Sequence, residues 1–307
     1  MDEQSRQVSE LVNGTNGRVS ELRANLVVSL RSSHAGDRRS AEYRRPVTLA
    51  ARLRSDGAVV EGSILDLSEG GLRLRVNAPA SSFREGRDAV VEAREIGTLE
   101  GSITAIGRTS VHLSFRNMNG ERQRELGAYL ASIDAADRIL IEAVQKAAKE
   151  TSAAFETAIL SGRITERELF EFKYRPIPGT DPQQYEAPFS AMCDSLLPSI
   201  QEPFLEIDPR VVFCAAVDRN AYLPTHNRQY SQPQRPGDPI WNASNSRNRR
   251  FFKDRAGMTA ARSRREYLIQ SYEREMGGGT VVLLKEIDVP IEVKGKHWGA
   301  LRLAFRA

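Results

Sequence analysis

The sequence predicts an α+β, multidomain protein: a small six-stranded antiparallel β-barrel, a long helix, and a C-terminal antiparallel sheet with helices packed against it. Between residues 47 and 115, apolar and polar residues alternate with the period of two that half-buried strands show. From about residue 121 to 160, apolar residues are three and four apart, as on one face of a helix. Strand patterns return after residue 210, and a chain of 307 residues is long enough for two cores.

The first 36 residues are expected to form an N-terminal helix. Val8, Leu11, Val19, Leu22 and Leu26 lie near the spacing of a single helical face. This helix has no local element to pack against. It can pair with a partner helix in a homodimer, or it can cover one of the domains, and the pattern leaves both arrangements open.

Residues 37–118 are predicted to form the barrel. Alternation begins at Val47, Leu49, Ala51 and Leu53. Further short strand patterns, separated by Gly, Asn, Ser and Asp turn residues, cover residues 58–65, 72–76, 89–93, 99–106 and 111–115. Short antiparallel strands at this spacing favour closure into a barrel, because closure leaves no exposed sheet edge.

Residues 119–162 are predicted to be a connecting helix. Leu126, Leu130, Leu140 and Val144 fall close to a heptad seam, which Asp137 interrupts. Two arrangements fit this seam. The helix can form a dimer with a second copy, or it can pack on the domains of its own chain.

Residues 163–307 are expected to form the second domain. Thr165 and Glu168 have the capping-box pattern, which predicts a short helix that starts before Leu169. A loop over residues 174–184 separates it from an amphipathic helix over 187–197. Strands over 211–217 and 221–225 flank a hairpin-type turn. After a polar segment, we expect a helix over 247–262 and strands over 267–272, 281–289 and 298–305.

The charge distribution predicts two anion-facing patches. The net charge of +4 is too small to indicate nucleic acid as a partner. However, residues 31–54 carry seven arginines against Asp37 and Glu42, and residues 247–265 carry eight basic residues against Asp254. Local binding of small anions therefore fits the sequence better than a generally cationic protein does.

The compartment is predicted to be the cytoplasm. Cys193 and Cys214 have no CxxC spacing, which is typical of buried thiols in a reducing environment. The N-terminus has no basic segment followed by an apolar one, so we expect no signal peptide. No run approaches the roughly 18 apolar residues that cross a bilayer.

Two segments offer the donors and acceptors that suit a guanine nucleotide. Residues 37–45 contain Arg38, Arg39 and Arg44, whose planar guanidinium groups can bind phosphate oxygens and the O6/N7 edge of guanine. Asp66 and Ser68 then supply a carboxylate and a hydroxyl between two strand patterns, next to a glycine turn. We expect the two segments to meet at one site.

The block Asp66-Leu67-Ser68-Glu69-Gly70-Gly71 resembles the PilZ domain, a family that binds the bacterial second messenger cyclic di-GMP. The resemblance covers roughly residues 37–118, and the family element (Asp/Asn)-x-Ser-x-x-Gly is matched at every fixed position. The family's other element is Arg-x-x-x-Arg. Arg44 fits its second arginine, but Ser40 stands in the first position and Arg39 is one residue out of step.

The resemblance implies a role for each residue of the site. Arginines of the first element would stack on guanine and bind phosphates, the aspartate would accept hydrogen bonds from guanine N1 and N2, and the serine would bind a phosphate or orient the aspartate. The glycine would supply the turn. The implied cyclic di-GMP site is Arg38, Arg39, Arg44, Asp66, Ser68 and Gly71. An alternative is a degenerate barrel that acts as a protein-interaction module, with sensing only by the C-terminal domain.

The C-terminal region resembles Cache/PAS-like sensor domains, in particular the C-terminal region of some alphaproteobacterial methyl-accepting chemotaxis proteins. The resemblance is carried by residues 218–227, by residues 241–250 and by His297-Trp298-Gly299. It implies a pocket over the sheet for an unknown small ligand. Candidate ligand-binding residues are Tyr222, His226, Asn227, Trp241, Asn242, Asn245, Arg247 and Arg250. Each also has a structural alternative, such as a core or capping role.

Motifs of catalysis are missing from the sequence. The histidines His34, His112, His226 and His297 are scattered, without HExxH or His/Cys metal spacing. The sequence contains neither GxSxG nor GxxxxGK[ST]. We therefore expect a protein without enzymatic activity, metal or cofactor.

The leading hypothesis is a cytoplasmic signalling protein with two inputs. Cyclic di-GMP would bind the barrel and order the preceding arginine segment, and a small ligand would bind the C-terminal domain. The output would be in chemotaxis or motility control, through a chemotaxis-pathway protein or a second copy of the chain.

Overall fold

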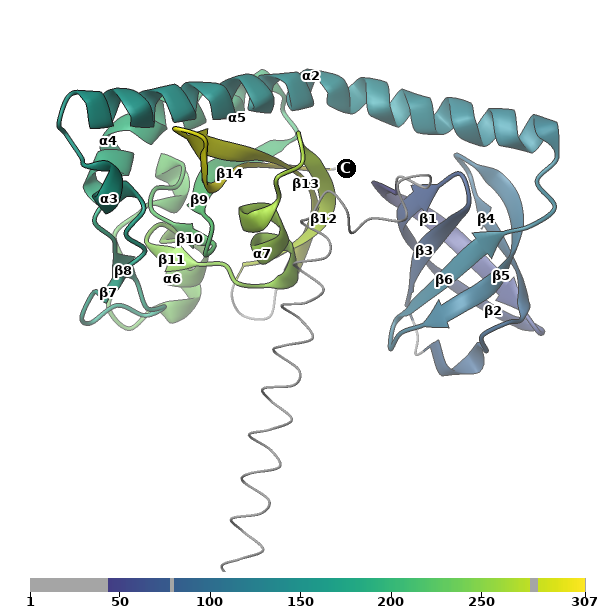
Figure 1. The fold of residues 1–307 in the computed structure, drawn as a ribbon. Helices are drawn as coiled ribbons and strands as arrows, with labels where there is room; N and C mark the ends of the chain where they lie inside the picture. The colour runs from purple at the N-terminus through teal and green to yellow at the C-terminus, as the bar shows by residue number, and fades with distance from the viewer. Residues whose placement is uncertain (1–43, 78–79, 277–280, 307) are drawn as a thin grey trace, which may run out of the picture.

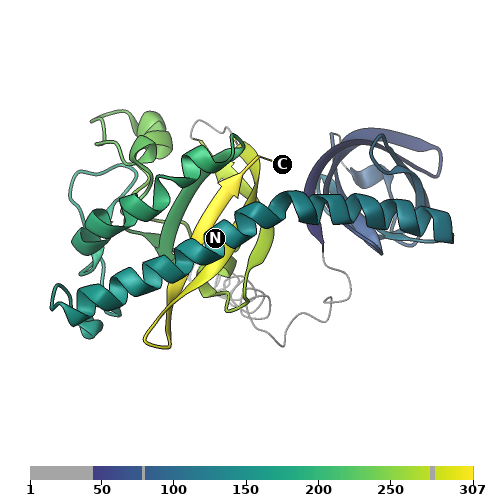
Figure 2. The same ribbon diagram turned by 90° about the horizontal axis from the view of Figure 1, so that it is seen from above.

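The computed structural model describes residues 44–77, 80–276 and 281–306. The helix expected over residues 1–36 lies outside this part of the chain. Two folded units lie along one long helix, α2 (Gly120–Leu160), which runs over both of them (Figures 1 and 2). The first unit is the barrel, and the second is built around a sheet.

The barrel consists of six antiparallel strands, as predicted, in the closed order β1-β2-β3-β6-β5-β4. Its strands are β1 (Arg45–Ser55), β2 (Ala58–Ser68), β3 (Gly71–Val76), β4 (Asp88–Ala93), β5 (Gly97–Ile106) and β6 (Ser110–Phe115), with the short helix η1 (Ala80–Ser82) after β3. Asp56 and Gly57 connect β1 to β2 with positive φ angles of 47° and 79°. A two-residue turn of this kind matches the twist of the strands that it joins.

The alternating side chains fill the barrel interior. Leu53, Ile64, Leu67, Leu72 and Leu74 are fully buried there. Between them lie side chains that are less buried and point outward, such as Arg52, Arg54 and Arg73, on the outer surface of the barrel.

Helix α2 serves both units. Asn119 caps its N-terminus by accepting a hydrogen bond from the Arg122 amide. Leu126 and Leu130 in its first half pack on the barrel core, whereas Val144 and Phe155 in its second half belong to the core of the second unit. The apolar seam is therefore covered by the helix's own chain.

Asp137 interrupts this seam because it pairs with another element. It lies between the two apolar halves of α2 and forms a buried ion pair with Lys285 on β13 (Val281–Val293). Both side chains are almost completely inaccessible. An ion pair at this depth fixes the position of α2 on the sheet, because separating the charges would leave both without a partner.

The second unit is a four-stranded antiparallel sheet in the order β12-β13-β14-β9. Its other strands are β9 (Val211–Asp218), β12 (Leu268–Glu275) and β14 (Lys296–Phe305). The helices are α3 (Glu166–Leu169), α4 (Ser190–Gln201), α5 (Phe204–Ile207), α6 (Pro239–Asn245) and α7 (Arg255–Arg262), with the short helix η2 (Arg228–Tyr230). Two small ribbons pair β7 (Arg175–Pro176) with β8 (Tyr185–Glu186) and β10 (Tyr222–Leu223) with β11 (Arg250–Phe251).

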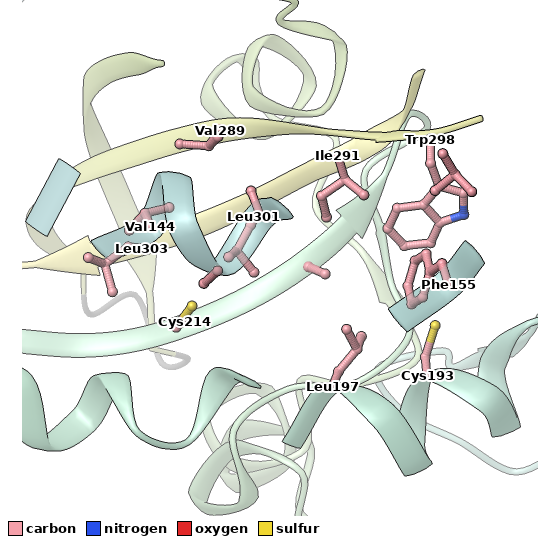
Figure 3. Packing of buried hydrophobic residues seen from close by; sticks show 14 of the residues in the cluster. Val144, Phe155, Cys193, Leu197, Cys214, Val289, Ile291, Trp298, Leu301 and Leu303 are labelled. Atoms are coloured by element: carbon pink, nitrogen blue, oxygen red, sulfur yellow. The ribbon is translucent and has the colours of Figure 1, made fainter. Parts of the chain in front are cut away.

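Helices cover both faces of this sheet. One face packs against α2 and α4, and Phe155, Leu197 and Trp298 meet in its core (Figure 3). The rings of Phe155 and Trp298 form an edge-to-face pair with centroids 5.0 Å apart. The other face packs against α7 through Phe213, Leu284 and the small residues of β14. The predicted α+β architecture of this unit is confirmed.

Two local predictions were wrong, and one helix was not predicted. The segment after β9 does not return as a hairpin: β10 pairs with β11, and β14 pairs with β9 instead. The helix expected over 247–262 begins only at Arg255, where Asp254 caps α7, and residues 250–251 form β11. The polar segment before it contains a helix, α6, that starts at Pro239 behind the cap Asp238.

Two findings bear on the compartment. Cys193 and Cys214 are buried free thiols, and burial raises the pKa of both. None of the helices in the described segments has the length and apolar character needed to cross a bilayer.

Candidate functional site

The β2–β3 hairpin positions the polar residues of the predicted site. Its register pairs Ser68 with Gly71, Leu67 with Leu72, and Asp66 with Arg73. Because Leu67 and Leu72 point into the barrel, Asp66 and Arg73 lie on its outer surface.

Asp66 lies between two guanidinium groups. Arg44 Nη1 contacts Asp66 Oδ1 at 2.6 Å, and Arg73 Nε contacts Asp66 Oδ2 at 2.8 Å. The Asp66 side chain is 15% exposed. The pairing of Asp66 with Pro46 across β1 and β2 explains why Arg44, two residues earlier, reaches it. Arg44, the described arginine of the predicted set, therefore does lie beside Asp66.

Ser68 and Gly71 close the end of the hairpin. Ser68 is fully buried and its Oγ donates a hydrogen bond to the Gly71 carbonyl at 3.1 Å. The turn itself consists of Glu69 and Gly70, and the Gly70 carbonyl accepts a hydrogen bond from the Phe115 amide at 2.8 Å.

Gly71 has a different structural role from the predicted one. It lies within β3, opposite Ser114 of β6. A Cβ atom at this position would lie 2.2 Å from the Leu113 carbonyl oxygen. Gly71 is therefore needed for the close approach of β3 to β6, and the turn is made by its predecessors.

The structure brings together Arg44, Asp66, Ser68 and Gly71 of the predicted set. Arg38 and Arg39 lie outside the described residues. Arg73 was missed by the sequence analysis, although a two-residue turn at Glu69-Gly70 would have predicted its position opposite Asp66.

A hollow of about 530 Å³ opens beside the hairpin turn. It is lined by Glu69 and Gly70 of the turn, by Asn117 at the end of β6, and by Gln123 in the first helical turn of α2. The Glu69 carboxylate can accept hydrogen bonds, and the side-chain amides of Asn117 and Gln123 can both accept and donate them. The site thus combines a cationic part at Arg44 and Arg73 with a polar hollow next to it.

Residues 37–132 match the family model of the PilZ domain. The chain contains a PilZ domain. The match begins with the arginine segment, includes the whole barrel and ends within α2. The search of curated proteins found no match.

Solved structures with a similar barrel come from several bacteria. The PilZ domain of YcgR from Escherichia coli, solved with c-di-GMP, is 16% identical over 34% of this chain and 98% of that chain, with a TM-score of 0.30. The Bacillus subtilis inhibitor of motility MotI/DgrA is 17% identical over 33% and 52%, with a TM-score of 0.28. The MrkH–c-di-GMP complex of K. pneumonia is 20% identical over 34% and 53%, with a TM-score of 0.27. This chain spans about half the length of the latter two.

The PilZ domain is joined to the rest of the chain next to its candidate site. Arg45, the neighbour of Arg44, binds Asp134 of α2 with two hydrogen bonds of 2.8 and 2.6 Å. On the other side of Asp66, the Leu65 carbonyl accepts a hydrogen bond from Ser271 Oγ of β12 at 3.4 Å. Arg45 and Leu65, which adjoin the ion-paired Arg44 and Asp66 in sequence, thus both contact elements outside the barrel.

The sensor candidates near β10 are part of the core. Tyr222 is fully buried, and its hydroxyl donates to the Tyr185 carbonyl at 2.8 Å. Asn227 accepts a hydrogen bond from the Cys214 amide, which fixes the loop to β9. His226 is buried against Phe213, and its Nδ1 accepts a hydrogen bond from the Asn227 amide. These contacts agree with the structural alternative for each residue.

The other sensor candidates surround α6. The Asn242 side chain bonds the Asp181 and Arg235 carbonyls, and the Asn245 side chain donates to the Trp241 carbonyl. Arg235 stacks over the Trp241 ring at 3.7 Å. Arg247 and Arg250 both donate to the Ala243 carbonyl, at 3.0 and 3.2 Å. These hydrogen bonds are made within the protein, and a ligand for these residues stays a prediction.

Metal donors do not cluster. Among residues 44–77, 80–276 and 281–306, no group of three His, Cys, Asp or Glu side chains could hold a metal ion.

Proposed function

We propose that this chain is a receptor for cyclic di-GMP and that the nucleotide binds at the β2–β3 end of the PilZ barrel. The observation that carries the proposal is the contact of Arg44 with Asp66, within residues that match the PilZ family. The arginine can donate hydrogen bonds to a phosphate or to the O6/N7 edge of guanine, and the aspartate can accept hydrogen bonds from the N–H groups of guanine.

In this mechanism Asp66 changes partners when the nucleotide binds. Its carboxylate accepts hydrogen bonds from guanine N1 and N2, in place of the one from Arg44. The released Arg44 guanidinium then binds a phosphate or stacks on guanine, as do arginines of residues 37–43. Arg73 keeps its ion pair and holds the carboxylate in position. Gly71 keeps β3 against β6 so that the site does not shift.

The proposal extends to a second input and to an output. The C-terminal unit is proposed to be a Cache/PAS-like sensor of a small ligand, supported by an antiparallel sheet with helices on both faces. The whole chain is proposed to act in the cytoplasm, in chemotaxis or motility control, through a chemotaxis-pathway partner or a second copy.

A second candidate function has one specific observation in its favour. Both oxygens of Asp66 are already bound by Arg44 and Arg73, and Ser40 stands where the family has an arginine. A barrel whose acceptor is satisfied internally could bind a protein partner instead of nucleotide. The C-terminal unit alone would then sense a ligand.

Calorimetric titration of the full chain with cyclic di-GMP tests the first proposal. We expect a Kd below about 50 μM for the natural chain, and at least about tenfold weaker binding for Asp66→Ala. Glu92→Ala is the matched control, because Glu92 also pairs with an arginine, Arg54, but lies on β4. Its Kd should not change. Binding that is absent from the natural chain, or that survives Asp66→Ala unchanged, would refute the proposal.

Substituting Ser40→Arg separates the two candidates. A receptor that works with its shifted arginines should gain little affinity. A gain of about a hundredfold, equivalent to roughly 3 kcal/mol, would mean that the natural site is impaired and would favour the protein-interaction module.

A further inference from the structure

Charged side chains line the sheet face that α7 covers. This face carries Gln270 and Arg274 on β12, Glu286 and Asp288 on β13, and Arg302 on β14. Along each strand they alternate with residues that point to the other face of the sheet, into the core under α2 and α4. Arg274, Glu286, Asp288 and Arg302 are at most 2% exposed. Charges at this depth are expected to be paired, because an unpaired buried charge costs several kcal/mol.

Arg302 meets this expectation. Its Nη2 donates to Glu286 Oε2 at 2.7 Å, and its Nε lies 3.4 Å from Asp288 Oδ1. Gln270 Nε2 also donates to Asp288 Oδ2 at 2.7 Å. One arginine is thus shared between two carboxylates, and burial raises the pKa of both.

Arg274 does not. It is 1% exposed, and all three of its guanidinium nitrogens lack a hydrogen-bond partner among the residues that the structure describes. Its guanidinium carbon lies 4.0 Å from the Tyr230 ring centroid and 5.1 Å from that of Phe213. The aromatic faces stabilise the cation but cannot accept its in-plane N–H groups.

The surroundings of Arg274 are electropositive. His226 contacts both aromatic rings, with centroids 5.1 Å from Phe213 and 4.9 Å from Tyr230. Burial, followed by the charges of Arg274, Arg247 and Arg302, holds the pKa of His226 well below its usual value. The two buried carboxylates of this sheet face, Glu286 and Asp288, are already bound to Arg302. The protein therefore supplies an excess of positive charge here.

We infer that Arg274 is the anchor of a binding site for a small carboxylate in the C-terminal unit, between the sheet and η2. Two parallel N–H groups of a guanidinium match the two oxygens of a carboxylate, and the pairing would satisfy the donors that the protein leaves unbound. Phe213 and Tyr230 provide an apolar wall for a short alkyl or aryl group. The ligand class is thus a monocarboxylate with a small apolar part. This site is separate from the proposed nucleotide site and does not depend on it.

The site predicts opposite effects for two equally buried arginines. Arg274→Met removes a buried charge that has no hydrogen-bond partner among the described residues, so it should raise the thermal midpoint of the ligand-free protein, by at least about 2 °C. Arg302→Met removes a paired charge and leaves Glu286 and Asp288 together, so it should lower the midpoint. If Arg274 were only a structural residue, both substitutions would lower it.

Thermal unfolding of the full chain, followed by tryptophan fluorescence, tests the inference. Both tryptophans, Trp241 and Trp298, belong to the C-terminal unit, so the signal reports on this unit. The probes are sodium acetate, butyrate and benzoate, with sodium chloride at equal ionic strength as the reference. We expect at least one carboxylate to raise the midpoint of the natural chain and of Asp66→Ala, and none to affect Arg274→Met.

Two results would overturn the inference. One is the absence of any carboxylate effect on the natural chain beyond that of chloride. The other is an equal carboxylate effect in the natural chain and Arg274→Met. The first result is decisive even if Arg274→Met does not fold.

Discussion

At the level of single residues, the proposed nucleotide site depends on how readily Asp66 exchanges partners. The Arg44 and Asp66 side chains are 29% and 15% exposed. An ion pair this close to solvent contributes at most about 1 kcal/mol. Breaking it therefore costs little compared with the contacts that a dinucleotide offers. Arg73 pairs with Asp66 across the hairpin and can hold the carboxylate in place during the exchange.

Arg44 and Arg73 should consequently differ in their effect on binding. We expect Arg44→Ala to weaken cyclic di-GMP binding by about tenfold to a hundredfold, because it removes a direct contact worth about 1–3 kcal/mol. Arg73→Ala should weaken binding less, because it affects only the position of Asp66. Arg52→Ala, which breaks an exposed pair on β1, is the control. Calorimetry that shows equal affinities for Arg44→Ala and Arg52→Ala would disprove the role of Arg44.

Asp218 should make the C-terminal unit pH-sensitive. Burial raises its pKa from 3.8 to about 6, despite hydrogen bonds from Tyr174 and from two backbone amides. Between pH 4 and 6 the folded chain therefore keeps a proton that the unfolded chain has lost. The free energy of unfolding should fall by about 3 kcal/mol from this group as the pH rises through that window.

Asp218→Asn should remove this contribution. Urea denaturation at pH 4, 5, 6 and 7 compares the two chains, and the stability of the variant relative to the natural chain should increase across the series. If the two curves run parallel, Asp218 does not titrate in this range in the folded protein.

At the level of elements, the sequence predicts strands and helices better than it predicts their partners. The alternation from Val47 to Leu53 gave the correct inward face because a one-residue shift would expose every apolar side chain. After β9, the pattern showed a strand at Tyr222 but not that Asp218 bonds the amides of Asn220 and Tyr222 and redirects the chain. The pairing of β10 with β11 joins residues far apart in sequence and is determined by the tertiary structure.

The same limit applies to the candidate site. Asp66, Ser68 and Arg44 were identified from motif spacing, since the motif is local in sequence. The position of Arg73 opposite Asp66 could have been predicted from the register of the hairpin. The role of Gly71 could not be predicted, because the Leu113 carbonyl that it must avoid comes from a strand about forty residues later.

The attachment of α2 to the sheet should depend on one buried pair. Lys285→Met leaves the Asp137 carboxylate buried alone, which should cost about 3–5 kcal/mol. Adding Asp137→Leu should restore most of the loss, because apolar side chains of similar size can replace a buried pair. Lys146→Met, which breaks an exposed pair on the same helix, is the control.

Urea denaturation followed by tryptophan fluorescence measures these effects, since Trp298 lies in the core that α2 covers. A double variant that is as unstable as Lys285→Met alone would contradict this explanation of Asp137.

At the level of the whole molecule, short contacts link the proposed nucleotide site to the sheet of the second unit. Leu65 contacts Ser271 of β12 directly, and a second route runs through α2. Arg44 binds Asp66, and its neighbour Arg45 binds Asp134 on α2. One helical turn later, Asp137 binds Lys285 on β13. Release of Arg44 by a nucleotide would therefore act on a residue that is directly joined to α2. We propose α2 as the element through which the barrel and the sheet influence each other.

This arrangement could not be predicted from the sequence. The seam of α2 fitted both a dimer and packing within one chain. The contacts of Arg45 with Asp134, 89 positions later, and of Asp137 with Lys285, 148 positions later, join residues with no local signature.

Asp134→Ala should separate binding from its transmission. The Kd for cyclic di-GMP should stay within about threefold of the natural value, because Asp134 contacts Arg45 and not the proposed ligand residues. Nucleotide-induced changes in the amide exchange of β13, which α2 contacts through Asp137, should disappear. If those changes persist in Asp134→Ala, coupling does not run through this pair.

Hydrogen exchange of the full chain, measured by mass spectrometry with and without cyclic di-GMP, tests the central claim most directly. We predict that the nucleotide increases protection in peptides covering residues 30–46 and 64–73, changes it in residues 128–140, and leaves residues 54–57 at the opposite rim of the barrel unaffected. Equal exchange of residues 30–46 and 64–73 in both conditions, at a saturating concentration of nucleotide, would contradict the proposed site.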